Sequence, residues 1–349
     1  MPRVVGVDPG TVSIDLCGLD DGRVVLDRSW PTVDALRDRA AFLSALEGTG
    51  PVDLIAGPSG YGLPLIRAQA AGENDLRLAF LAPPGEEGGI GGLRRLAREL
   101  ARSGLPVVYT PGVIHLDTVP RSRKFNRVDL GTADKVAAAA LGIAEQSRLL
   151  GCPVEDTSFI LLELGGAFTA ALAVDGGRIV DGAGGTTGPI GWRSAGAWDG
   201  EVAYLAGSVT KTMLFQGGVA LIAEQRVASR ETAVAAFVEG AVKAVWSLRV
   251  SVPEPKEILL SGRALAEAEV ETQLEDAFRS LAPVRRLAGF ARIAKPAAQG
   301  AAIIADGLAG GAFRPVVDCM RLRHAAGTVL DHLVVISPAA AARRLGIDR

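Results

Sequence analysis

The chain has 349 residues, of which 48% are hydrophobic and 22% charged, and this length predicts two domains rather than one core. Its formal net charge of -2 excludes a strong general attraction to nucleic acid or to an anionic membrane, and its three widely spaced cysteines give neither a disulfide framework nor a metal-ligand spacing. No apolar run reaches the roughly 20 residues of a membrane span and no signal-peptide pattern opens the chain, so we expect a cytoplasmic protein.

The N-terminal segment predicts a three-strand meander. A short apolar strand over residues 4–7 ends at Asp8-Pro9-Gly10-Thr11, a return strand covers 13–19, and a third strand over 23–28 follows the turn at 20–22. The elements expected next are a helix over 32–46, a strand over 51–56, a helix over 93–103, a strand over 107–109, a basic loop over 118–128 and an alanine-rich helix over 132–149.

The same order of elements recurs in the middle of the chain. An apolar strand over 159–164 ends at Gly165-Gly166, and strands over 170–174 and 178–180 flank a glycine turn. This repetition predicts an internal duplication with one α/β domain per copy and a ligand cleft between them. The elements expected after it are helices over 201–214, 231–250, 264–281 and 296–309, strands over 257–260 and 333–336, and a small terminal helix.

Both glycine turns are candidate phosphate sites. Glycines let backbone N–H groups approach a phosphate without interference from Cβ atoms, which favours Gly10, Thr11, Gly165 and Gly166 as nucleotide-binding residues. Asp8 at the end of the first strand is a candidate Mg²⁺ ligand and catalytic residue, the alternative being a carboxylate that only caps the turn.

Glu163 precedes the second glycine turn and has two open interpretations. Strand alternation buries Leu162 and Leu164 together and sends Glu163 to the opposite face. It is then either a solvent-facing strand residue or a member of the site.

The segment around the start of the helix at 132 supplies further candidates. Asp134 lies in the first turn, where it either suits the helix dipole or acts as a cleft carboxylate that orients an acceptor or Mg²⁺. An arginine of the preceding basic loop, with Arg123 as the candidate, would clamp an acyl phosphate or carboxylate, unless the loop is merely solvated.

Two later glycine-rich turns complete the set of candidate residues. Arg193 follows the loop 184–191 and would reach the transferring phosphoryl group, the alternative being a flexible surface loop. Ser261 and Gly262 form a strand-to-helix turn whose backbone would hold adenine or ribose.

These motifs, in this order, resemble the superfamily of acetate and sugar kinases, heat-shock ATPases and actin. Residues 8–11 resemble its first phosphate motif and residues 164–166 its second. Residues 260–262 resemble its adenosine motif, and 131–141 and 299–309 resemble its two connecting helices. The resemblance implies an α/β fold with two ribonuclease H-like (actin-like ATPase) domains around a central nucleotide cleft. The N-terminal domain would cover residues 1–155, completed by part of the tail 297–349, and the C-terminal nucleotide-binding domain 156–296.

Within that superfamily the chain most resembles butyrate and acetate kinases, including a group predicted to be butyrate-kinase-like. The run from Gly165-Gly166 through 177–181 and Gly188-Pro189 to Arg193-Ser194 carries this resemblance. The acetokinase pattern has histidine where Glu163 stands and Ser-His where Asp134-Lys135 stand. We read these exchanges as a loss of imidazoles in favour of carboxylates, which removes positive charge from the site and leaves the acceptor open.

The resemblance implies an ATP- and Mg²⁺-dependent phosphotransferase with a short-chain carboxylate such as butyrate as its acceptor. The expected partner is this small molecule, without nucleic acid or membrane, and a homodimer is possible. Two alternatives stay open: an ATP-hydrolysing switch or activator that phosphorylates no small molecule, and a non-catalytic nucleotide-binding protein.

Overall fold

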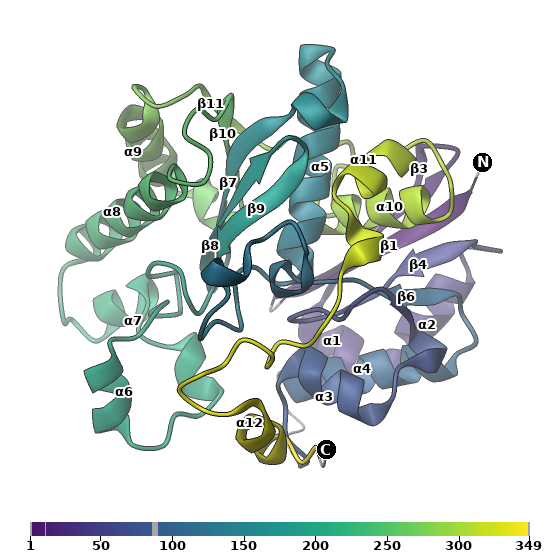
Figure 1. Ribbon diagram of the computed structural model, residues 1–349, viewed down its shortest axis with the longest axis horizontal. Helices are drawn as coiled ribbons and strands as arrows, with labels where there is room; N and C mark the ends of the chain where they lie inside the picture. The colour runs from purple at the N-terminus through teal and green to yellow at the C-terminus, as the bar shows by residue number, and fades with distance from the viewer. Residues whose placement is uncertain (1, 11, 86–89, 348–349) are drawn as a thin grey trace.

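Two β-sheets flank a long central helix in the computed structural model, which describes residues 2–10, 12–85 and 90–347 (Figure 1). The first sheet has the strand order β3-β2-β1-β4-β6-β5. Its strands are β1 (Arg3–Pro9), β2 (Ser13–Asp20), β3 (Arg23–Pro31), β4 (Leu54–Ala56), β5 (Ile66–Arg67) and β6 (Val107–Tyr109). The second sheet has the order β11-β10-β7-β8-β9. Its strands are β7 (Ser158–Leu164), β8 (Thr169–Asp175), β9 (Arg178–Ala183), β10 (Glu257–Ser261) and β11 (Val284–Arg286).

The two sheets share one topology. In the first, β1, β2 and β3 form an antiparallel meander, and β4 and β6 continue the sheet in parallel on the other side of β1. In the second, β7, β8 and β9 form the meander, and β10 and β11 continue it in parallel beyond β7. This agrees with the predicted duplication. β1 and β7 are buried along nearly their whole length because they lie inside their sheets, which explains their continuous apolar runs.

The helices pack on these sheets and between them. They are α1 (Thr32–Arg37), α2 (Arg39–Glu47), α3 (Glu73–Phe80), α4 (Ile90–Arg102), α5 (Ala133–Leu150), α6 (Gly200–Ala206), α7 (Val219–Glu224), α8 (Arg230–Leu248), α9 (Ala268–Phe278), α10 (Pro296–Leu308), α11 (Arg314–Cys319) and α12 (Pro338–Arg344). None of the helices in the described part of the chain is long and apolar enough to cross a membrane.

Small residues bring α5, α10 and β1 into close contact. A Cβ at Gly6 of β1 would lie 2.2 Å from backbone atoms of Ala298 and Ala302 in α10. A Cβ at Gly300 would lie 1.7 Å from the carbonyl oxygen of Ala137 in α5. The glycines and alanines of α5 and α10 therefore serve close packing, as their composition predicts, and fix the starts of both helices relative to β1.

The structure corrects three predicted elements. The helix expected over 32–46 is broken at Asp38, whose side chain accepts a hydrogen bond from Ala41 N and begins α2. The helix expected over 201–214 ends at Ala206, because Gly207 adopts a positive φ of 68°. The strand expected over 333–336 is wrong: this segment is irregular, and its backbone N–H groups at 334 and 335 donate to the side chain of Asn126.

Candidate functional site

A cavity of about 540 Å³ lies between the two sheets, and we call it the central cavity. Its walls come from the ends of β1 and β7, the first turns of α5 and α10, and the turn after β10. The predicted site residues that line it are Asp8, Gly10, Asp134, Gly165, Gly166, Ser261 and Gly262. Thr11 lies outside the described residues.

The two glycine turns face each other across this cavity. A Cβ at Gly166 would lie 3.7 Å from Cγ2 of Val12 in the first turn and 3.9 Å from Cδ of Arg263. The backbone N–H groups of Val12 and Gly166 have no hydrogen-bond acceptor among the residues that the structure describes. Val12 and Gly166 both line the cavity, which makes their N–H groups candidate donors to an anion.

Glycine is required where β10 turns into the cavity. Gly262 has a φ of 109°, and a Cβ there would lie 2.3 Å from the carbonyl oxygen of Leu164. This close approach holds the turn after β10 against the end of β7. Arg263 follows directly, lines the cavity, and makes no ion pair with any described residue.

Lys295 contacts two buried carboxylates beside the first glycine turn. Its ammonium nitrogen lies 3.1 Å from Asp8 Oδ2, 2.7 Å from Asp15 Oδ2 and 3.3 Å from the carbonyl oxygen of Ser13. Burial raises the pKa of Asp8; Lys295 opposes this, and the nearby charge of Asp134 raises it further. Burial disfavours the charge on Lys295, but Asp8 and Asp15 outweigh this effect and raise its pKa.

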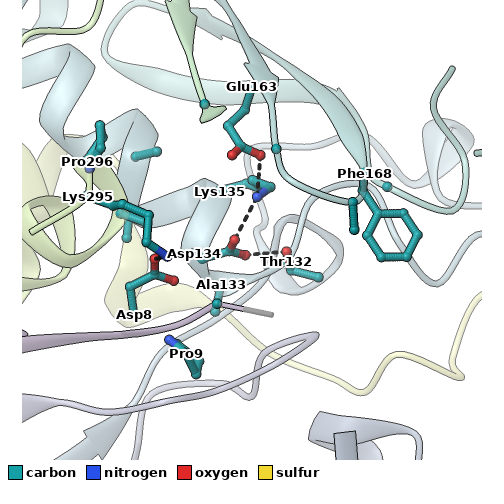
Figure 2. Close-up of a pocket in the computed structure, with 18 of the residues that line it drawn as sticks. Asp8, Pro9, Thr132, Ala133, Asp134, Lys135, Glu163, Phe168, Lys295 and Pro296 are labelled. Carbon is teal, nitrogen blue, oxygen red and sulfur yellow. Dashed lines mark hydrogen bonds and ion pairs between the residues drawn. The ribbon is translucent and has the colours of Figure 1, made fainter. Parts of the chain in front are cut away.

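Lys135 forms the second lysine–carboxylate group of the site (Figure 2). Its Nζ lies 2.7 Å from Asp134 Oδ2 and forms an ion pair with Glu163, while the Thr132 hydroxyl donates to Asp134. Burial opposes the charged forms, yet the pairing raises the pKa of Lys135 and lowers the pKa of Asp134. Both groups are ionised at neutral pH.

This group settles the open question about Glu163. Its side chain is 17% exposed and lines the cavity, so it is not a solvent-facing strand residue. The reading that carboxylates simply replace imidazoles here is also corrected, because Lys135 supplies a positive charge at that place.

Arg123 and Arg193 lie away from the other candidates. Arg123 donates to the carbonyl oxygen of Val180 at 2.6 Å and its Nε lies 3.5 Å from Asp181, whereas Arg193 is exposed. Neither side chain lines the central cavity. Their proposed contact with a transferring phosphoryl group therefore has no support from this arrangement, and Arg263 takes the corresponding place in the cavity wall.

Residues 6–335 match the family model described as "Protein of unknown function (DUF1464)". The chain belongs to this family. No curated protein matches it.

Three solved structures share the fold of this DUF1464 chain. A propionate kinase from Francisella tularensis subsp. tularensis SCHU S4 is similar at a TM-score of 0.59 and 14% identity, over 86% of this chain and 99% of that one. Acetate kinase from Entamoeba histolytica is similar at a TM-score of 0.55 and 11% identity, over 80% of this chain and 87% of that one. Acetate kinase from Porphyromonas gingivalis is similar at a TM-score of 0.54 and 15% identity, over 80% of this chain and 88% of that one. The predicted fold class, the two-domain actin-like ATPase fold, is confirmed.

The charged groups of the cavity fit a divalent cation. No cluster of three or more His, Cys, Asp or Glu side chains suited to a metal occurs in the described part of the chain, but Mg²⁺ is usually held by one or two carboxylates plus substrate phosphates and water. Asp134 raises the pKa of Asp8, so the two carboxylates are close enough to repel each other. We call Asp8, Asp15, Asp134, Glu163, Lys135 and Lys295 the charged cluster.

Proposed function

We propose that the protein is an ATP- and Mg²⁺-dependent phosphotransferase that converts a small, butyrate-like carboxylic acid into an acyl phosphate. The observation that carries this proposal is the meeting of two glycine turns and the charged cluster in one cavity. The likeness to propionate and acetate kinases supports it through the fold alone.

The residues of the cavity divide the binding of ATP among them. The N–H groups of Val12 and Gly166 would donate to phosphate oxygens, and the guanidinium of Arg263 would add charge-assisted bonds to the same phosphates. The turn at Ser261 and Gly262 would hold the nucleoside against backbone, since Gly262 has no side chain to block it.

The chemistry requires positioning and positive charge more than bond-making groups. An ionised carboxylate carries no proton that must be removed, so the attacking oxygen needs no general base. Lys135 and Lys295 stay protonated at neutral pH and lie where negative charge gathers during phosphoryl transfer. Asp8 and Asp134 would hold Mg²⁺, which would supply positive charge to the phosphates.

Turnover of the full-length protein tests the proposal. With ATP, Mg²⁺ and butyrate we expect ADP release that depends on the acid, matched by acyl phosphate trapped as its hydroxamate. Asp8→Ala should abolish both signals if Asp8 serves the metal. ATP hydrolysis that no carboxylate changes would instead favour a nucleotide switch. Absence of any heat or thermal shift with ATP–Mg²⁺ would reject both forms of ATP-dependent activity.

A further inference from the structure

One part of the central cavity is walled by large apolar side chains. We call Tyr61, Phe80, Phe168, Leu214 and Phe215 the aromatic wall, and all of them line the cavity. Figure 2 shows Phe168 on the far side of Thr132 and Asp134 from Lys295 and Pro296. Phe168, one member of the aromatic wall, therefore lies beyond Asp134 on the side away from Lys295.

Side-chain contacts join the wall across the two halves of the fold. The rings of Phe168 and Phe215 meet edge to face with centroids 4.9 Å apart. The Lys211 ammonium, in the same segment as Phe215, lies 5.1 Å from the ring centroid of Tyr61. A Cβ at Gly60 would lie 2.9 Å from Phe80 Cδ1, so Tyr61 and Phe80 are also neighbours. Rings from both halves of the chain thus line this part of the cavity.

Two polar side chains that line the cavity with the wall, Ser59 and Asp129, are already bonded to protein groups. Ser59 Oγ donates to the carbonyl oxygen of Gly57 at 3.1 Å and accepts from Thr110 N at 2.8 Å. Asp129 accepts from Thr186 N at 3.0 Å and Thr186 Oγ1 at 3.1 Å. A polyhydroxylated ligand would have to break these bonds or leave its own hydroxyls unpaired, either of which is costly.

We propose that the aromatic wall binds the body of the phosphoryl acceptor, and that this acceptor is a monocarboxylic acid with a branched or aromatic apolar body rather than a sugar. The inference rests on the proposed function and specifies its substrate. A carboxylate oxygen attacks the γ-phosphorus of ATP, the new O–P bond forms, and the bond to the β,γ-bridging oxygen breaks. ADP leaves with that electron pair.

A graded series of acceptors tests the compartment. Acyl phosphate formation by the full-length protein would be measured with acetate, propionate, butyrate, isovalerate and phenylacetate, and ADP release with glucose. Burial of each added methylene should raise kcat/KM roughly fourfold. Phenylacetate should exceed acetate by at least about tenfold, and glucose should give no ADP above the rate without acceptor.

Variants of one ring locate the effect. Phe215→Ala should lower kcat/KM for phenylacetate about tenfold, change that for acetate less than about threefold, and leave the KM for ATP unchanged. Phe215→Trp fills the compartment instead and should exclude phenylacetate while acetate is still turned over. Phe125→Ala is the matched control, because Phe125 is 49% exposed and does not line the cavity.

The possible failures are distinguishable. A flat acid series, or a preference for acetate, would overturn the compartment while the kinase proposal stands. A raised KM for ATP in Phe215→Ala would mean that the wall holds the nucleobase, which also overturns it. If no acid is phosphorylated, thermal shifts with phenylacetate decide: a shift in the unmodified protein that Phe215→Trp removes supports the compartment even though the kinase proposal has failed, and no shift rejects both.

Discussion

Removal of Lys295 tests how far the stability of the fold depends on the positive partner of two buried carboxylates. Lys295 is the only described cation that contacts both Asp8 and Asp15, at 3.1 Å and 2.7 Å. Lys295→Met would leave two carboxylates buried together without a positive partner. Breaking a fully buried pair costs about 3–5 kcal/mol, but the Lys295 side chain is 36% exposed, and solvent screening reduces the expected loss to about 2 kcal/mol.

Asp8→Asn gives the opposite result. Lys295 keeps its contact with Asp15, so the free energy of unfolding should fall by no more than about 1 kcal/mol. Turnover should fall at least about a hundredfold, because the proposed metal ligand is lost. Urea unfolding followed by circular dichroism, with activity measured on the same samples, compares the two variants.

The pH dependence of Lys295→Met identifies the cause of its instability. Loss of the lysine raises the pKa of Asp8 further above its unfolded value, so the folded state of the variant binds more protons than the unfolded state. The deficit relative to the unmodified protein should therefore be largest at about pH 7 and shrink towards about pH 5. Lys243→Met, which removes a lysine that is 74% exposed, is the control. A deficit in Lys295→Met that is no larger than in this control, or that is equal at both pH values, would refute the reasoning.

Three further predictions concern glycine turns, a buried histidine and Lys135. A Cβ at Gly166 has no described neighbour closer than 3.7 Å, so Gly166→Ala should leave the melting temperature unchanged while it weakens ATP binding in calorimetry. Gly262 has a φ of 109°, so Gly262→Ala should lower the free energy of unfolding by about 2 kcal/mol even without ATP. Burial lowers the pKa of His115 to about 4, whereas its ordinary value is about 6.5. Between these two pH values the unfolded state binds a proton that the folded state does not, so the free energy of unfolding should fall by roughly 3 kcal/mol as the pH drops through this range. His115→Gln should lack this loss in acid unfolding. Lys135→Met should lower kcat about a hundredfold, Lys135→Arg should restore part of it, and Glu163→Gln should shift the pH profile of kcat; unchanged kcat in Lys135→Met would contradict its role.

The order of apolar and glycine residues along the chain predicted the buried strands of both sheets. Continuous apolar runs ending in glycine gave β1 and β7, and their repetition gave the matching topology of the two sheets. The predicted strand over 333–336 failed because Val334 and Val335 are 71% and 89% exposed, and apolar composition alone says nothing about burial.

The site was only partly predictable because its charges pair across long stretches of chain. Lys295 contacts Asp8 from 287 positions away, and nothing in the sequence around Lys295 marks it as more than a helix start. Arg123 and Arg193 are predicted as site residues because they lie in basic or glycine-rich segments. Such segments indicate a loop, but they do not say which cavity the loop faces. Three-dimensional packing decides that.

The internal duplication could have identified Glu163 as a residue of the site. Asp8 is the second residue from the end of β1, and Glu163 is the second residue from the end of β7, with a glycine two positions beyond each. The acidic residue absent from the second glycine turn is therefore present as Glu163, in the equivalent place.

Each of these carboxylates pairs with a lysine at the start of a helix: Asp8 with Lys295 before α10, which packs on β1, and Glu163 with Lys135 in α5. Both glycine turns thus have a carboxylate in the equivalent place, and each carboxylate has a lysine partner at the central cavity. If the proposed phosphotransferase activity is correct, the transferring phosphoryl group would lie between Lys135 and Lys295, and these lysines would supply the positive charge expected of the site.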